Sequence, residues 1–213
     1  MSYRGDPLSV RLRAETRAAH DAAQRSGFLG SLAAGRLPFA AYADLAAQHW
    51  FVYEALELAA SAMAHDPVAG AFVAPELNRL PAIESDLTFL YGRGWEYRIE
   101  ALPATTTYCT RLREVAFAGA PGFIAHHYTR YLADLSDGQY LGPAIARAYR
   151  LSADGHRFFV FEGVDPYGFK ARYRQMLDAL NWPRSQERIF MGEVGEAYRL
   201  NIGLLTELKE RWT

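Results

Sequence analysis

Hydrophobic residues recur through most of the chain at the three- and four-residue steps of an amphipathic α-helix. The first such segment has one column of residues at steps of four: Leu8, Leu12, Thr16, His20 and Gln24. Asp6 and Pro7 come before it and suit an N-cap and a first helical position, while Gly27 follows as a C-terminal stop. The pattern therefore predicts a first helix between Pro7 and Gly27.

The same periodicity predicts six further helices. Their approximate ranges are 38–64, 81–91, 104–118, 123–149, 167–180 and 185–212. Proline or glycine bounds most of them, as expected where helices begin or end. We find no strand pattern, internal repeat or long linker. The sequence therefore predicts an all-α protein that forms a single domain over residues 1–213.

The 123–149 segment carries helix-breaking residues in its middle, at Gly138, Gly142 and Pro143. Glycine costs about 1 kcal/mol and proline about 3 kcal/mol in a helix interior. We therefore expect a kink in this helix. Small residues there would also let the backbone approach a flat ligand closely.

Charge and cysteine content exclude several classes of protein. The formal net charge is −1, whereas a general nucleic-acid binder would show a basic excess. The lone Cys109 allows no intramolecular disulfide and suits a reducing compartment, and we expect it to be a buried, inert thiol. The N-terminus has no apolar signal-peptide core, and no apolar run reaches about 18 residues. We therefore expect a cytoplasmic protein without membrane insertion, monomeric by default.

The six histidines form no HExxH pattern, and the chain has no CxxC pair, so a structural zinc site is not indicated. His20 has neighbours that suit an iron ligand. Gln24, one turn on, can accept a hydrogen bond from the ring nitrogen that does not bind metal. Arg17 and Arg13 lie one and two turns back, within about 10 Å, where heme propionates could reach them. The alternative is a packed or surface histidine.

Residues 126–139 resemble the distal-helix signature of heme oxygenases. They read HHYTRYLADLSDGQ, where the signature usually reads HHY-x-RYLGDLSGGQ. Weaker similarities follow in the family's order, in the ranges 13–28, 51–57, 158–163, 169–174 and 200–202. The resemblance covers nearly the whole chain and implies a helical fold in which heme lies between a proximal helix and a kinked distal helix.

The resemblance implies roles for individual residues. His20 would be the proximal iron ligand. The implied heme-binding residues are Arg13, Arg17, Gln24, Tyr128, Ala133, Asp137, Gly138, Lys170 and Arg174. Four of these would hold the propionates, namely Arg13, Tyr128, Lys170 and Arg174. Asp134 would anchor a catalytic water network with Tyr53, Arg130 and Asn201, which would deliver protons to iron-bound oxygen.

The implied chemistry is the O₂-dependent opening of heme b, which is both cofactor and substrate. Electrons would come from a separate donor, a ferredoxin or a flavoprotein reductase. A neutral histidine ligand donates less electron density to the iron than a thiolate does, so it favours O–O cleavage less strongly. An iron-bound hydroperoxide would therefore survive long enough to attack the ring. The products would be biliverdin, CO and ferrous iron.

Three positions depart from the family pattern. Ala133 and Asp137 replace glycines that normally touch heme, and Gln24 replaces a glutamate that commonly supports the proximal histidine. A methyl at Ala133 is a small overpacking, and Asp137, if buried, would need a partner such as a water, Arg130 or a hydroxyl. Gln24 should raise the heme potential.

These departures keep other functions open. A non-enzymatic heme carrier or sensor on the same fold would bind heme without opening it, and a peroxidase-like protein would break the O–O bond early. Thiaminase-like enzymes share the architecture and bind no heme, so the fold alone does not decide.

Overall fold

The computed structural model describes residues 5–24, 27–152 and 154–213, with the backbone alone over residues 19–24. Within these residues the chain is helical and has no strand, which confirms the all-α prediction. The α-helices are α1 (Leu8–Gln24), α2 (Phe28–Ala33), α3 (Phe39–Met63), α4 (Leu80–Tyr91), α5 (Pro103–Val115), α6 (Ala120–Tyr149), α7 (Pro166–Asp178) and α8 (Arg184–Trp212). Short 3₁₀ helices are η1 (Ala69–Phe72), η2 (Pro75–Leu77), η3 (Trp95–Tyr97) and η4 (Arg157–Phe159). None of the described helices is long and apolar enough to cross a lipid bilayer.

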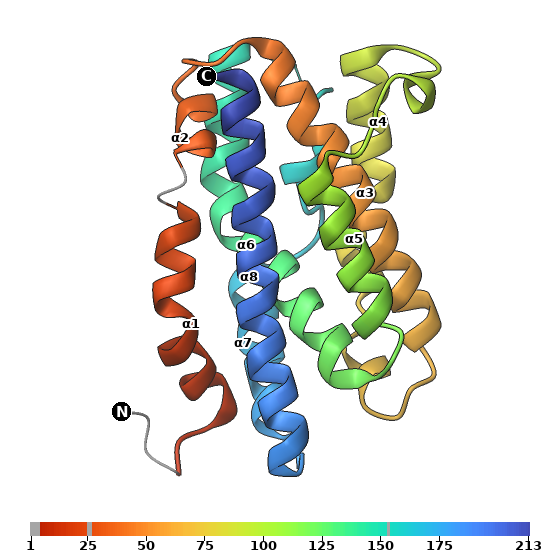
Figure 1. Ribbon diagram of the computed structural model, residues 1–213, viewed down its shortest axis with the longest axis vertical. Helices are drawn as coiled ribbons and strands as arrows, with labels where there is room; N and C mark the ends of the chain where they lie inside the picture. Colours follow the sequence, from red (N-terminus) through yellow and green to blue (C-terminus); the bar gives the residue numbers. More distant parts are fainter. Residues whose placement is uncertain (1–4, 25–26, 153) are drawn as a thin grey trace.

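The long helix α8 runs through the middle of the fold (Figure 1). Helix α1 lies along one side of it, and α6 packs against it from behind in this view. Helices α3 and α5 pack together on the other side, and α4 lies on the far face of α3. This arrangement places α1, α6, α7 and α8 around one region of the molecule, where the site described below is found.

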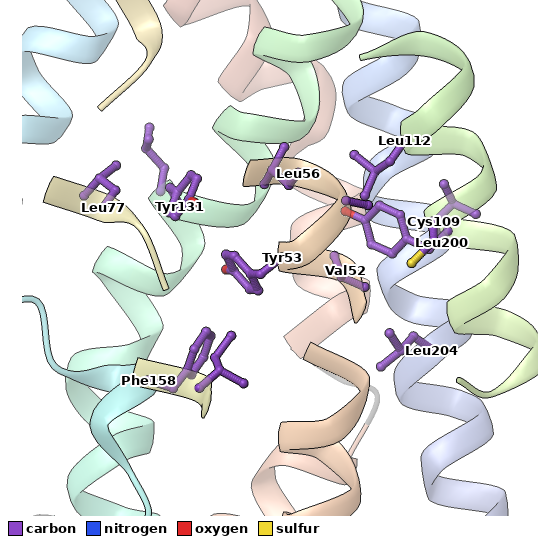
Figure 2. Packing of buried hydrophobic residues seen from close by; sticks show 14 of the residues in the cluster. Val52, Tyr53, Leu56, Leu77, Cys109, Leu112, Tyr131, Phe158, Leu200 and Leu204 are labelled. Atoms are coloured by element: carbon purple, nitrogen blue, oxygen red, sulfur yellow. The ribbon is translucent and has the colours of Figure 1, made fainter. Parts of the chain in front are cut away.

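Helix α3 is buried on almost every side over its first half, because α4, α5, α6 and α8 all pack against it. The sequence pattern predicted a single apolar stripe, which is narrower than the surface that the fold covers. Figure 2 shows Val52, Tyr53 and Leu56 of α3 in the core, with Tyr131 of α6 on one side and Leu200 of α8 on the other. Polar groups on α3 therefore need partners inside the protein.

Glu57 of α3 shows how such a partner set is built. Its carboxylate accepts hydrogen bonds from the backbone N–H of Arg79, at 2.5 Å, and of Leu80, at 3.2 Å. It also accepts one from the hydroxyl of Tyr131 on α6, at 3.2 Å. These bonds satisfy N–H groups at the start of α4 and link α3, α4 and α6 at one point.

Glu193 links its own helix, α8, to α5 and α6 in the same way. It pairs with Arg111 of α5 at 2.6 Å and with His126 of α6 at 3.0 Å. Burial alone would raise the pKa of Glu193, but its hydrogen bonds to His126 and Arg111 lower that pKa to about 2. The carboxylate therefore stays ionised and holds α5, α6 and α8 together.

Helix α6 continues through Pro143, which lies in its interior. Figure 1 shows the green first part and the teal second part of α6 running in different directions, as the breaking residues predicted. The helix persists because its buried residues on both sides of the proline, such as Leu135 and Ile145, pack in the core. Tertiary packing thus outweighs the local cost of proline.

The sequence pattern missed α2 and misread Gly27. Gly27 is the N-cap residue of α2, with φ +81°, rather than only the end of the first helix. Helix α2 has six residues, too few for a recognisable repeat. Its Phe28 and Leu32 are fully buried, so packing rather than periodicity forms it.

Gly142 and Gly138 differ in how closely Phe159 approaches them, which gives a matched pair of substitutions. A Cβ at Gly142 would lie 2.6 Å from Phe159 Cβ, whereas one at Gly138 would lie 3.5 Å from Phe159 Cδ1, an ordinary contact. We predict that Gly142→Ala lowers the free energy of unfolding of the heme-free protein by about 1–3 kcal/mol. Gly138→Ala should leave it unchanged or raise it by up to about 1 kcal/mol. Urea unfolding measures both, and equal effects would contradict the prediction.

Candidate functional site

A cavity lies between α3, α6, α8 and the loop that contains η4; we call it the distal cavity. It is partly open to solvent. Its polar lining consists of His49, Thr129, Arg130, Asp134, Asp137, Tyr198 and Asn201. Its other lining residues are Leu29, Leu45, Ala133, Gly138, Leu141, Phe158, Phe159 and Leu205. Three of the four predicted catalytic residues therefore face one space.

A second hollow lies between α1, α6, α7 and α8; we call it the basic cleft. It encloses about 1220 Å³ of space that opens to solvent. It is lined by Arg13, Thr16, Arg17, Tyr128, Leu132, Ala133, Ser136, Lys170, Arg174 and Tyr198. All four residues predicted to hold propionates are in this list, together with Arg17. Ala133 and Tyr198 line both hollows, so the two spaces meet at these residues.

The side chain of Arg130 is buried and organises the polar end of the distal cavity. Its Nη1 donates to Asn201 Oδ1 at 2.6 Å, and its Nη2 lies 3.9 Å from Asp134 Oδ1. The guanidinium also lies over the ring of Tyr53, 5.1 Å from its centroid. The hydroxyl of Tyr53 in turn donates to Asp134 Oδ2. The four predicted catalytic residues thus form one network across α3, α6 and α8.

Asp134 is the acid–base candidate in this network. Burial, followed by the nearby Asp137 carboxylate, holds the pKa of Asp134 well above its usual range. A carboxyl group with a raised pKa keeps its proton at a higher pH than an ordinary aspartate does, so it can serve as a proton donor as well as an acceptor. Nε of Arg130 is buried and has no hydrogen-bond partner among the described residues, so a water or bound ligand is needed to satisfy it.

Asp137 lines the distal cavity, half-buried, three residues after Asp134 on α6. Of the three partners that we named for a buried Asp137, Arg130 does not pair with it, because Arg130 is turned toward Asn201 and Asp134. Partial exposure explains why Asp137 needs no such partner. Its negative charge acts on its surroundings instead, raising the pKa of Asp134 and opposing the burial that lowers the pKa of Lys170.

The residues of the basic cleft are close enough to influence one another. Burial raises the pKa of Tyr128, while the charges of Arg174 and Arg13 act in the opposite direction. Lys170 donates a hydrogen bond to Ser136 Oγ at 3.0 Å, which holds α7 against α6. Guanidinium and ammonium groups around one opening form a site for carboxylates. The cleft can therefore bind an anion that carries more than one carboxylate.

Two predicted residues cannot be placed in the same way. His20 and Gln24 belong to α1, but their side chains lie outside the described residues. Arg13 and Arg17, on the same helix, line the basic cleft. The iron-ligand and supporting roles of His20 and Gln24 therefore remain predictions.

Sequence reasoning missed three polar residues of the distal cavity: His49, Thr129 and Tyr198. Tyr198 lies three residues before Asn201 on α8, so the helical step from a predicted site residue could have found it. Thr129 precedes Arg130 within the signature segment. His49 was one of several residues in the apolar pattern of α3, and nothing in its spacing distinguished it from core residues.

Removing the charge of Asp137 should change the acidity of its neighbour. We predict that Asp137→Asn lowers the pKa of Asp134 in the heme-free protein, because a like charge no longer disfavours ionisation. Carboxyl ¹³C chemical shifts recorded over a pH series measure this pKa. Asp154→Asn, at an exposed carboxylate that pairs with Arg157, is the matched control and should leave Asp134 unchanged. An equal pKa in the Asp137 variant would contradict the prediction.

The raised pKa of Asp134 also affects folding. A carboxyl group whose pKa is higher in the folded state gives stability that is present below the unfolded pKa and lost as pH rises through the folded pKa. We predict that Asp134→Asn becomes increasingly more stable than the unsubstituted protein as pH rises above the ordinary aspartate pKa of 3.8. Urea unfolding of the heme-free proteins at several pH values measures the difference, which should not shrink toward alkaline pH.

Comparisons with known proteins identify the family of this chain. A family model described as "Heme oxygenase" matches residues 6–207. The heme oxygenase of Rhodella violacea is 34% identical over 207 residues, covering 96% of this chain and 88% of the relative. A crystal structure of heme oxygenase-1 from the cyanobacterium Synechocystis in complex with heme superposes with TM-score 0.90 at 31% identity, covering 97% and 94% of the two chains. The heme oxygenase of Leptospira interrogans gives TM-score 0.88 at 33% identity, covering 95% and 100%. The chain therefore belongs to the heme oxygenase family.

Proposed function

We propose that this protein is a heme oxygenase that cleaves heme to biliverdin, CO and ferrous iron. The observation that carries the proposal is the buried network of Tyr53, Arg130, Asp134 and Asn201 in a cavity that adjoins a cleft lined with cations. Heme, as substrate, would bring an apolar ring and two propionates, and its iron would activate O₂. An apolar cavity wall and a basic opening suit such a molecule.

The basic cleft would hold the propionates. Arg13, Arg17, Lys170 and Arg174 supply positive charge, and Tyr128 supplies a buried hydroxyl. Arginine can bind a carboxylate through two parallel N–H groups, whereas lysine acts as a point charge. His20 of α1 would be the iron ligand, with Gln24 one turn away to support its ring. Ala133 and Gly138 of α6 would face the ring from the other side.

The distal network would hold and move the protons that the reaction needs. Asp134 receives the Tyr53 hydrogen bond, so its carboxyl group is fixed in orientation. The guanidinium of Arg130, held by Asn201, places a positive charge near Asp134. Its Nη2 lies 3.9 Å from Asp134 Oδ1, which is longer than a hydrogen bond. Waters bound to Asp134 and to Nε of Arg130 would carry protons into the cavity, and the surrounding aromatic residues would exclude bulk solvent.

Some parts of the proposal concern the protein's surroundings. The reaction requires electrons, which we propose come from a ferredoxin or a flavoprotein reductase that meets the positively charged rim of the cleft. We further propose a cytoplasmic monomer. Cys109 is a free, buried thiol with a pKa raised by burial to about 11, which suits a reducing compartment.

The test follows the visible spectrum of the protein mixed with one equivalent of hemin, a reducing system and O₂. We expect loss of the Soret band and growth of the biliverdin band. In Asp134→Ala the rate of ring opening should fall by about 10²–10⁴-fold, the usual contribution of a positioned acid–base group. Asp154→Asn, at an exposed carboxylate, is the control and should retain the rate.

Other outcomes would identify another function. A stable heme complex that never opens under reductant and O₂ would contradict the oxygenase and favour a carrier or sensor, for which the Ala133 and Asp137 departures are the argument. High-valent heme that accumulates with peroxide would favour a peroxidase. Absence of any Soret change on adding hemin would favour a thiaminase-like enzyme on the same fold.

A further inference from the structure

His49 of α3 lies in the distal cavity but has no place in the network described above. Its side chain is buried, with 8% of the residue's surface exposed. Its ring stands 4.7 Å from the ring of Phe158 and meets Tyr53 edge-on at 6.3 Å, measured between centroids. Among the described residues neither ring nitrogen makes a hydrogen bond. His49 lines two hollows, so a partner in either of them can reach the imidazole.

The imidazole of His49 is held in its neutral form. Burial, and then the positive charge of Arg130, lower the pKa of His49 well below its usual range. A neutral imidazole has one N–H donor and one nitrogen acceptor, so it can link two partners of opposite kinds. His49 can form these two hydrogen bonds close to Arg130, the cation of the predicted catalytic network.

A second, much smaller cavity, with room for about one water, is also lined by His49; we call it the Asp86 cavity. Its polar lining is Tyr42, His49 and Asp86, and its other lining residues are apolar. Four residues line both this cavity and the distal cavity, namely Leu45, His49, Phe158 and Phe159. His49 is the polar member of that set and therefore the group through which hydrogen bonds could pass between the cavities.

The Asp86 cavity offers enough polar groups to hold a water. Oδ1 and Oδ2 of Asp86 accept the backbone N–H groups of Arg157 and Phe158, each at 2.8 Å, and a carboxylate retains further acceptor sites. The hydroxyl of Tyr42 donates to the carbonyl of Gly155 at 2.5 Å, which leaves its oxygen free to accept. With His49 these give three partners, and buried waters typically have two to four, about three on average.

We propose that His49 binds a water molecule in each cavity and so joins the distal cavity to the Asp86 carboxylate. His49 is then a positioning residue that forms a second branch of the hydrogen-bonded network around Asp134. The role of His49 in the reaction rests on the proposed function. Its hydrogen bonds to water do not, because they form in the heme-free protein.

The first experiment uses heme-free protein labelled with ¹⁵N-histidine. We expect magnetisation to pass from water to the ring N–H of His49. His127 is an internal control, because it is also buried but its ring bonds to the hydroxyl of Tyr173 at 3.1 Å. Absence of transfer to His49, or equal transfer to both rings, would overturn the proposal.

A second heme-free sample tests the connection between the cavities. Tyr42→Phe removes one of the three polar groups around the Asp86 cavity while keeping the aromatic ring. We expect weaker transfer from water to His49 in this variant. Unchanged transfer would overturn the link to the Asp86 cavity.

The third experiment asks whether His49 reaches the reaction site, with CO bound to the ferrous heme complex as an infrared probe. His49→Leu should raise the C–O stretching frequency, because a hydrogen-bond donor near the oxygen is lost. His49→Gln, which keeps a donor and an acceptor, should return the frequency toward that of the unsubstituted protein. An unchanged frequency in the leucine variant, or no return in the glutamine variant, would overturn the role of His49 in the distal network. Failure to bind heme would instead refute the proposed function and leave the first experiment valid.

Discussion

The architecture of this protein depends on a cation buried between helices. Arg130 of α6 is buried away from bulk water, so Asn201 of α8 and the Tyr53 ring of α3 lie within reach of its guanidinium. Leaving such a charge without partners would cost several kcal/mol. The relative positions of α3, α6 and α8 are therefore constrained by the same contacts that place Asp134, and the fold cannot shift in this region without disturbing its chemistry.

Helix α6 divides the site into two chemically different parts. One part of its surface, with Arg130, Asp134 and Asp137, lines the distal cavity, and another, with Tyr128 and Ser136, lines the basic cleft. A single bent helix thus presents acidic residues to one hollow and residues of a basic lining to the other, within one turn of each other. The buried carboxylates of Glu57 and Glu193 hold this helix to its neighbours on either side of the site.

The sequence predicted most of this arrangement, because the long motif at residues 126–139 carries both the helix type and the chemistry. Helix boundaries followed from periodicity and from proline and glycine. Helix α2 was missed because six residues have no measurable repeat. His49 was missed for a different reason: its spacing on α3 is that of a core residue, and only the packing of Phe158 and Arg130 around it reveals a polar site.

The cost of burying Asp134 also has a consequence for the evolution of the family. A carboxyl group held in a buried place beside a second carboxylate weakens the folded state at neutral pH, so selection for stability alone would favour its replacement. A lineage that stopped opening heme and kept only the ability to carry it would be free to accept that replacement, and random mutation would supply it. Among relatives with altered signatures, the residue at this position should therefore separate chains still under selection for turnover from those that have drifted to other uses.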